Sequence, residues 1–172
     1  CLEVLGEIEK LKLRGMTFQC NLRADKLNDE LAKKLSDVHV WLVHIGLESA
    51  NDRVLRGIGK NASQADNIRT LELLKKHQIK VYGFLMLYNA WETAGKLEYE
   101  TPEEVNNTLE FAKNCLRDNL IEYISWSITN PIIGSKLYHI AKKHNIAAYN
   151  VKIGNCMKLP GISEQQMVEH VK

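Results

Sequence analysis

The stretch VHVWLVHIGLESANDRVLRGIGK, residues 38–60, decides the fold expected for this chain. It opens with a dense apolar run, residues 38–47, whose β-branched and aromatic side chains predict a buried strand. Glu48 stands where this run ends, and a polar turn and a short helical piece follow it. Ligands of parallel α/β sheets bind at the carboxyl ends of the strands. Glu48 is therefore either a ligand-binding carboxylate or a solvated acid that begins a loop.

On both sides of this stretch, helical and strand patterns alternate along the chain. Apolar residues at helical spacing, together with capping residues, predict helices at residues 2–13, 28–35, 53–57, 64–77, 101–117 and 136–144. Short apolar runs predict strands at residues 16–22, 38–47, 79–87 and 121–128. We expect a long loop from Tyr88 to Glu100, and a tail after Ala147 without a strong period until Ser163 begins a last short helix.

The alternation predicts an α/β fold in which parallel strands are joined by right-handed crossovers. Four strands are few for a closed barrel, so the sheet either stays open or is part of a barrel. There is no linker, low-complexity tract or internal repeat. We therefore expect residues 1–172 to form a single domain.

Composition excludes several classes of protein. The 172 residues are 45% hydrophobic with a formal net charge of +2, which is too balanced to indicate a nucleic-acid or membrane partner. No apolar run approaches the roughly 18 residues of a membrane span. The four cysteines, Cys1, Cys20, Cys115 and Cys156, are scattered and form no CxxC pair. We expect neither a metal site built from neighbouring cysteines nor a disulfide framework, and a cytoplasmic location.

Several segments, taken in order, resemble the radical S-adenosylmethionine (SAM) enzymes. GLES at residues 46–49, with Val54, Leu55 and Lys60 behind it, resembles their fourth strand, and FQCNLRAD before it resembles the third. VYGFLML and SKLYHIAKKHNI resemble the fifth strand and the sixth unit. The likeness is closest to the group that often carries an N-terminal cobalamin-binding domain. It implies a partial parallel (β/α) barrel, of which this chain is a C-terminal part with about four βα units.

The sequence also departs from this family. The CxxxCxxC motif that holds the family's four-iron four-sulfur cluster is absent, and so is the Gly-Gly-Glu-type turn after the second strand. The chain begins at Cys1 without a methionine, so we expect a piece of a longer protein whose cluster-binding part lies upstream. The turn that usually ends the family's fifth strand is replaced by a longer segment up to Glu100.

The resemblance implies roles for particular residues. A reduced cluster cleaves SAM to a 5′-deoxyadenosyl radical, and the protein binds, orients and excludes water. Glu48 is then expected to accept hydrogen bonds from the SAM ribose or amine, and Lys60 to pair with the SAM carboxylate. Arg23 is expected to serve SAM or a neighbouring carboxylate, or instead to form a structural ion pair with Asp25 or Glu48. The groups around Ser127 and Thr129 are expected near the adenine.

The inserted segment offers substrate contacts. Tyr88, Asn89 and Trp91 are candidate residues for a small-molecule substrate, the alternative for Trp91 being simple packing. We expect Trp41 and Trp126 in the core or barrel lining.

The histidines show no metal-binding pattern. His39 and His44 are expected on opposite faces of one strand. The other four histidines are expected to be mostly solvated.

Two other functions stay open from the residues alone. One is a barrel enzyme without radical chemistry that uses Glu48 as an acid or base, and the other is a non-catalytic α/β binding module. The resemblance implies that the strand at residues 16–22 lacks the preceding barrel strand as its partner. An unpaired strand edge favours self-association.

Overall fold

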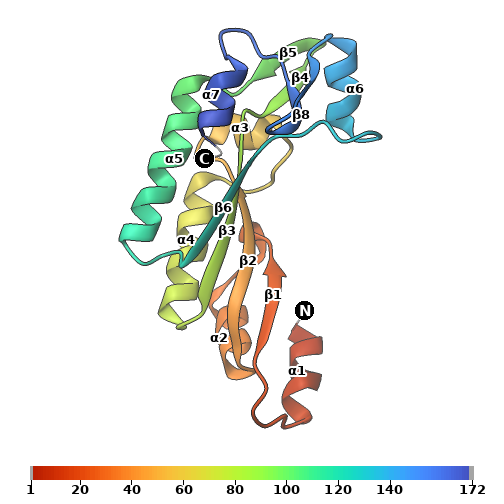
Figure 1. The fold of residues 1–172 in the computed structure, drawn as a ribbon. Coiled ribbons are helices and arrows are strands. Elements are labelled where there is room, and N and C mark those ends of the chain that lie inside the picture. Colours follow the sequence, from red (N-terminus) through yellow and green to blue (C-terminus); the bar gives the residue numbers. More distant parts are fainter. Residues whose placement is uncertain (1, 171–172) are drawn as a thin grey trace. The chain divides into compact units, whose positions relative to one another are not determined.

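The computed structural model describes residues 2–170 of the protein (Figure 1). The helices are α1 (Leu2–Lys10), α2 (Asp29–Asp37), α3 (Asp52–Gly57), α4 (Gln64–Lys76), α5 (Pro102–Arg117), α6 (Lys136–Lys143) and α7 (Glu164–Glu169), with a 3-10 turn at Ala24–Lys26. The strands are β1 (Phe18–Leu22), β2 (Val40–Glu48), β3 (Lys80–Leu87), β4 (Ala90–Thr93), β5 (Lys96–Tyr99), β6 (Tyr123–Ile128), β7 (Ala147–Asn150) and β8 (Gly154–Met157). Every helix and strand predicted from the sequence is present, with ends that differ by a few residues.

The principal sheet has four strands in the order β1-β2-β3-β6, and their arrows point the same way in Figure 1. β1 pairs in parallel with β2, so that Phe18 lies opposite Val40 and Leu22 opposite Ile45. The predicted α/β class with a parallel sheet is therefore confirmed. Within residues 2–170, β1 is an edge strand whose hydrogen-bonded neighbour is β2 alone.

The chain divides into two compact units. The first unit comprises Cys1–Leu47, Ala62–Phe84 and Phe111–Ser125. The second unit comprises Glu48–Asn61, Leu85–Glu110 and Trp126–Lys172. The carboxyl ends of β2, β3 and β6 thus belong to the second unit, where the functional residues predicted at these ends are found.

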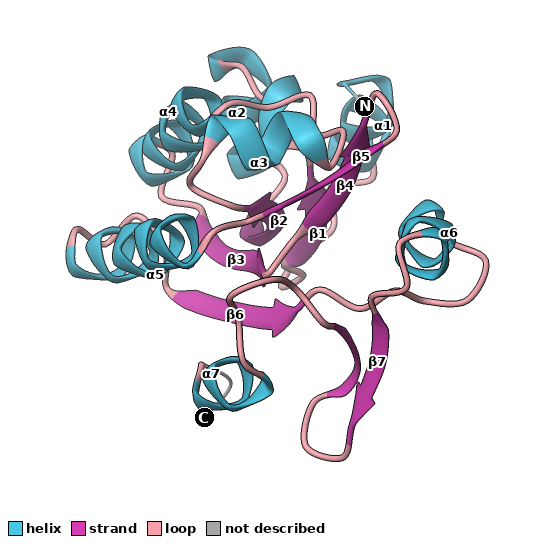
Figure 2. Cartoon of the chain, turned by 90° about the horizontal axis from the view of Figure 1, so that it is seen from above, coloured by secondary structure: helices cyan, strands magenta, loops and turns pink. Residues whose placement is uncertain are grey.

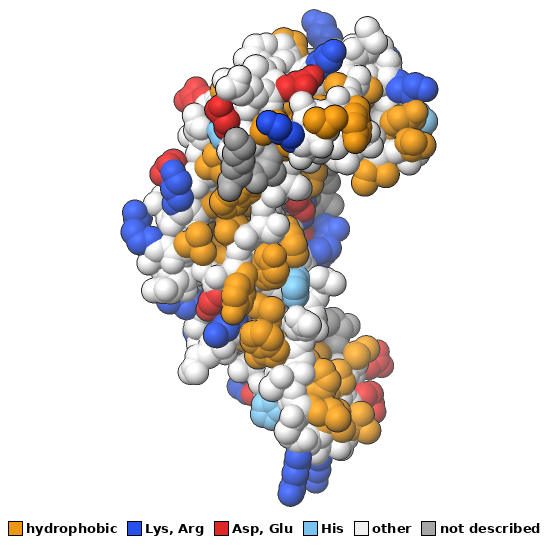
Figure 3. Space-filling view, viewed as in Figure 1, with side chains coloured by type: hydrophobic (Ala, Val, Ile, Leu, Met, Phe, Trp, Pro, Cys, Tyr) orange, Lys and Arg blue, Asp and Glu red, His pale blue; other side chains and the backbone are white. Residues whose placement is uncertain are grey.

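In the first unit, α2 and α4 lie on one side of β1 and β2 (Figure 2). Alternation along β2 buries Val43, Ile45 and Leu47 completely on that side, as expected for a strand with one face against helices. The opposite face carries a row of rings from His44 through Tyr82 and Phe84 to Tyr123. Apolar side chains gather along these strands in Figure 3.

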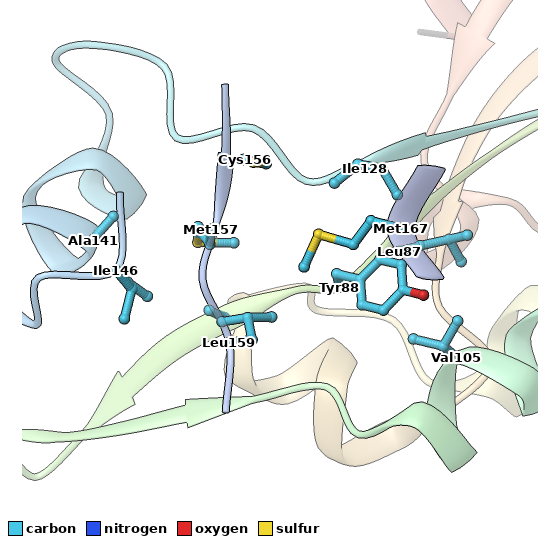
Figure 4. Close-up of a cluster of buried hydrophobic side chains, with 11 residues drawn as sticks. Leu87, Tyr88, Val105, Ile128, Ala141, Ile146, Cys156, Met157, Leu159 and Met167 are labelled. Carbon is cyan, nitrogen blue, oxygen red and sulfur yellow. The ribbon is translucent and has the colours of Figure 1, made fainter. Parts of the chain in front are cut away.

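In the second unit, a separate apolar cluster forms the core (Figure 4). Its buried members are Leu87, Tyr88, Ala90, Val105, Ile128, Ala141, Ile146, Cys156, Met157, Leu159 and Met167. In Figure 4 the ring of Tyr88 lies between Met167 and Val105. Contacts with the last helix thus fix the residue that follows β3.

Two segments differ from the sequence prediction. The expected loop from Tyr88 to Glu100 contains the antiparallel hairpin β4–β5. Its two-residue turn has positive φ at both Ala94 (49°) and Gly95 (80°), the geometry that suits a tight hairpin. The tail contains a second antiparallel hairpin, β7–β8, in which Ala147 pairs with Met157. Strands of four residues are too short to show a clear period.

Several single residues also correct the sequence prediction. Trp41 and Trp126 are 42% and 37% exposed rather than packed in a core. His39 precedes β2 with a φ of +64° instead of lying within the strand. His77 and His144 are not simply solvated, since their rings contact Asp29 and Glu92 at 3.0 and 2.8 Å respectively.

The described residues include no helix that is both long and apolar enough to cross a membrane.

Candidate functional site

The site begins with a contact between Glu48 and Lys60. Lys60 Nζ donates a hydrogen bond of 2.9 Å to Glu48 Oε1, and the two side chains are 21% and 19% exposed. The resemblance assigned both residues to SAM although they stand twelve positions apart in the sequence, and the structure brings them together.

The backbone of Glu48 is strained. Its φ is +65°, a left-handed conformation that costs a residue with a side chain about 1–2 kcal/mol. Such strain persists where the surrounding structure holds it in place, and it gathers at functional sites. Glu48 thus combines a charged side chain with an energetically unfavourable backbone conformation at the carboxyl end of β2.

The end of α3 places Lys60. The amide of Gly59 donates to Arg56 O, and the amide of Lys60 donates to Leu55 O at 2.8 Å. Gly59 has a φ of +76°, which lets the chain reverse after the helix as glycine commonly does. The reversal returns the Lys60 side chain to Glu48.

Arg53 holds α3 against the inserted hairpin. Its guanidinium donates two hydrogen bonds to Glu104, at 2.8 and 2.6 Å, and one to Glu98 at 3.1 Å. It also lies 4.8 Å from the centre of the Trp91 ring, within the range of a cation–π contact. The bonds from Arg53 lower the pKa of the Glu104 carboxyl. The helix that precedes Lys60 is therefore tied to β5 and to the first turn of α5.

A buried carboxylate joins the ends of three strands. Ser49 Oγ donates to Glu100 Oε1 at 3.2 Å, and the Asn89 amide and Nδ2 donate to Glu100 Oε2 at 3.1 and 3.0 Å. Thr129 Oγ1 donates in turn to Asn89 Oδ1 at 2.9 Å. Ser49, Asn89 and Thr129 come directly or almost directly after β2, β3 and β6. Glu100 thus fixes the spacing of the strand ends.

Burial changes the acidity of this group. Glu100 has no exposed surface, and desolvation raises its pKa to about 6 although the bonds from Asn89 and Ser49 act in the opposite direction. Sequence reasoning missed Glu100 because a charged residue beside a turn ordinarily predicts exposure. Its place at the end of the inserted segment, immediately before a helix cap, was the available signal.

A groove of about 280 Å³ lies in the second unit. Three of the predicted site residues line it, namely Asn89, Trp91 and Thr129. The other lining residues are Gly57, Ile58, Met86, Ala90, Ser135, Lys136, Leu137 and Ile140. Tyr88 is not among them, and its hydroxyl lies 2.7 Å from His170 Nδ1. Burial raises the pKa of the Tyr88 hydroxyl to about 12.

Two further predicted residues are not among those that line this groove. Arg23 belongs to the first unit, where Nε and Nη2 donate to Asp25 at 3.0 and 3.1 Å. These bonds lower the pKa of the Asp25 carboxyl to about 2. The structure therefore shows the ion-pair alternative for Arg23. Ser127 is an exposed residue of β6.

The donor set does not fit an iron–sulfur cluster. Within residues 2–170, no group of three or more His, Cys, Asp or Glu side chains is placed to hold a metal ion. Cys20, Cys115 and Cys156 are free, and desolvation raises the pKa of each thiol, which disfavours the thiolate that binds iron. For SAM the fit is better, since Glu48 offers an acceptor and Lys60 a compact cation.

Comparison with known families identifies the class of protein. The family model of the Radical SAM superfamily matches residues 2–112. The chain therefore belongs to the radical SAM superfamily, a family that uses SAM and a four-iron four-sulfur cluster.

Two curated relatives share this sequence pattern. An uncharacterised methyltransferase of Pyrococcus horikoshii is 27% identical over 139 residues, which are 80% of this chain and 28% of the relative. A putative methylthiotransferase of Methanocaldococcus jannaschii is 24% identical over 169 residues, 95% of this chain and 34% of the relative. The chain thus spans about a third of the length of these relatives.

Solved structures share the fold. The radical SAM methyltransferase TsrM from Kitasatospora setae, with cobalamin and a [4Fe-4S] cluster bound, matches 74% of this chain and 23% of its own, with a TM-score of 0.61 and 17% identity. Coproporphyrinogen III oxidase (HemN) from Escherichia coli, a radical SAM enzyme, matches 98% and 35%, with a TM-score of 0.66 and 12% identity. These similarities confirm the predicted partial barrel.

Proposed function

We propose that this chain is the C-terminal part of a radical SAM enzyme and that it supplies contacts to SAM and to substrate. The observation that carries the proposal is the Glu48–Lys60 pair, held at a strained strand end in a member of this family. When bound, the cluster supplies the electron for reductive cleavage of SAM. In this proposal its ligands come from a part of the parent protein that lies upstream.

Glu48 and Lys60 carry opposite charges, and SAM has groups that suit each of them. Glu48 accepts hydrogen bonds from ribose hydroxyls or the ammonium, and Lys60 donates to the carboxylate. Both side chains are only about one fifth exposed, so opening their ion pair without new partners would leave two desolvated charges unpaired, which is costly. SAM supplies a new partner for each charge, and charge-assisted hydrogen bonds to a ligand contribute about 1.5–3 kcal/mol each.

The buried network serves these contacts indirectly. Glu100 holds Ser49 at the residue that follows Glu48, and it holds Asn89 at the groove. A displaced catalytic group loses much of its effect even when the shift is about 1 Å. In this proposal Glu100 positions the strand ends and has no direct part in the chemistry.

The groove is the proposed substrate site. Asn89 and Trp91 line it directly, whereas Tyr88 supports it from the core beneath. We place the SAM adenine near the backbone of Ser127 and Thr129, and we keep Arg23 as a residue that reaches SAM or a neighbouring carboxylate only if its bond to Asp25 opens. Cobalamin is the proposed additional cofactor of the parent, since the similar TsrM structure contains it.

Two further proposals concern assembly. Residues 1–172 act as a single domain of the parent, a C-terminal portion of its partial barrel. The free edge of β1 pairs with an upstream strand there, and it promotes self-association when this chain is alone.

Anaerobic reconstitution tests whether the cluster ligands lie outside this chain. The 172-residue chain and a longer protein that includes the upstream segment are each incubated with iron and sulfide. We expect a stoichiometric four-iron spectrum and formation of 5′-deoxyadenosine from SAM only with the longer protein. A full cluster in the short chain would contradict the proposal, and so would a cluster-loaded long protein that fails to bind SAM.

A further inference from the structure

The groove in the second unit has mostly apolar walls and one charged lining residue. Its volume of about 280 Å³ lies near the lower limit of ordinary ligand pockets. Apolar side chains, among them Met86, Trp91, Leu137 and Ile140, form most of its walls. The space and the walls suit a ring or a short branched chain.

The amide and hydroxyl side chains of the groove are already engaged. Asn89 Oδ1 accepts from Thr129, and Asn89 Nδ2 donates to Glu100 and to Met86 O. Ser135 Oγ accepts from the amide of Tyr138 as the cap of α6. These groups shape the groove, but their bonds leave charge recognition to another residue.

Lys136 is the charged residue of the groove. No Asp or Glu is among the lining residues, so the groove itself contains no counterion for Lys136. On the same helix, Lys143 pairs with Glu92 and Lys142 lies over the Tyr138 ring. Within residues 2–170, the Lys136 side chain forms no such ion pair or ring contact, and no hydrogen bond.

The position of Lys136 in its helix also matters. It is the first residue of α6, where the helix dipole disfavours a cation and favours an anion. A positive charge at this position, exposed beside an apolar groove without acids, is matched by a ligand that brings a negative charge.

We infer that the groove binds a small apolar substrate that carries an anionic group, a carboxylate or a phosphate, and that Lys136 recognises this group. The inference rests on the proposed function in placing the substrate here. It also distinguishes the substrate from SAM, which carries a net positive charge: the SAM sulfonium and ammonium meet no carboxylate among the groove-lining residues, and the SAM carboxylate is assigned to Lys60. Lys136 is thus a specificity-determining residue.

Three probes of equal length test the inference on the 172-residue chain. 3-Phenylpropionate is an anion, 3-phenylpropanamide is neutral and 3-phenylpropylamine is a cation. Binding is followed by the indole N–H resonance of Trp91, which is assigned by its loss in Trp91→Phe. We expect the anion to bind about two- to fivefold more tightly than the amide, the range of a partly exposed ion pair, and the amine to bind most weakly.

Substitutions then locate the charge. Lys136→Gln is expected to lower the affinity for the anion to that for the amide and to leave amide binding unchanged. Lys96→Gln, in β5 and outside the groove lining, is the control and should change neither. Equal binding of the three probes would overturn the inference, as would equal losses for anion and amide in Lys136→Gln or an unmoved Trp91 signal.

A SAM titration distinguishes this inference from the proposed function. Because the SAM adenine is placed near Thr129, which lines the groove, the deciding observation is competition: SAM that displaces 3-phenylpropionate would show that the groove is a SAM site, and would overturn the assignment to substrate. SAM binding that depends on Glu48 and Lys60 in the longer protein, without such competition, is the expected result. The two proposals therefore fail by different measurements.

Discussion

Lys60 Nζ lies 2.9 Å from Glu48 Oε1, and Glu48 holds this contact from a left-handed backbone with a φ of +65°. Glycine would occupy this backbone position at lower cost. The sequence nevertheless places a carboxylate here, directly before the buried Ser49. Such a conflict between local preference and observed residue is typical of a functional position.

Glu48→Gly tests the strain. We expect the free energy of unfolding to stay equal or to rise by up to about 1 kcal/mol, because glycine removes the cost of the positive φ. Urea denaturation of the 172-residue chain measures it. The matched control is Gly59→Ala, where φ is +76°, which should lower the free energy of unfolding by about 1 kcal/mol. A loss of 2 kcal/mol or more in Glu48→Gly would contradict a strained functional position.

The buried carboxyl of Glu100 predicts an unusual pH dependence. Its pKa is about 6 in the folded protein, against 4.5 for an ordinary glutamate. Between these values the folded state binds more protons than the unfolded state, so this group lowers stability as the pH rises through that window. At about 1.4 kcal/mol per pKa unit the loss is about 2 kcal/mol.

Glu100→Gln removes this titration. The free energy of unfolding of wild type and variant, measured at pH 5 and pH 7.5, should change by about 1–2 kcal/mol in favour of the variant over this interval. The hydrogen bonds lost by the substitution contribute at both pH values and cancel in the comparison. Identical pH dependence of the two proteins would show that folding does not raise the pKa of Glu100.

The contact between Gly57 and Trp91 predicts a steric effect. A Cβ at Gly57 would lie 2.2 Å from atoms of the Trp91 ring, so Gly57→Ala displaces the indole that lines the groove. We expect a loss of about 1–3 kcal/mol in the free energy of unfolding. Gly6→Ala, in α1 with no atom within 4 Å of the added carbon, should be neutral or slightly stabilising.

Fluorescence and denaturation of Gly57→Ala with Trp91→Ala complete this test. The double variant should recover part of the loss caused by Gly57→Ala, because the two substitutions act on one contact. If the losses of Gly57→Ala and Trp91→Ala simply add, the Trp91 ring does not lie against Gly57.

The edge of β1 predicts association of the isolated chain. Within the described residues β1 has β2 as its neighbour, and an open strand edge pairs readily with another chain. Sedimentation velocity should show larger species as concentration rises, and Asn21→Lys, which adds a charge to the edge, should reduce them. A monomer at all concentrations for both proteins would contradict the prediction.

The elements with a clear period were predictable from sequence. The apolar run before Glu48 predicted β2, and Ser163 marked the start of α7. Ser163 forms a reciprocal capping box there, as Ser63 does at the start of α4. These signals are local, since a strand pattern or a cap depends on neighbouring residues.

The remaining features depend on contacts across the sequence. The hairpin β4–β5 has four-residue strands, too short for a period. Glu100 is buried because Ser49, 51 positions away, and Asn89 supply its donors. Arg53 is placed by Glu104, a partner 51 positions away. No spacing rule links such residues, so the sequence suggested Glu48 and Lys60 as candidates but did not indicate that Glu100 is buried.

SAM affinity in the cluster-loaded longer protein tests the central claim most directly. Glu48→Gln and Lys60→Ala each remove one charge-assisted contact, and each should weaken SAM binding by about 1.5–3 kcal/mol, roughly ten- to a hundredfold. Calorimetric titration of wild type and both variants, with circular dichroism to verify the fold, measures this loss. Affinities within about 0.5 kcal/mol of wild type in both variants would show that Glu48 and Lys60 are solvated loop charges and would contradict the account.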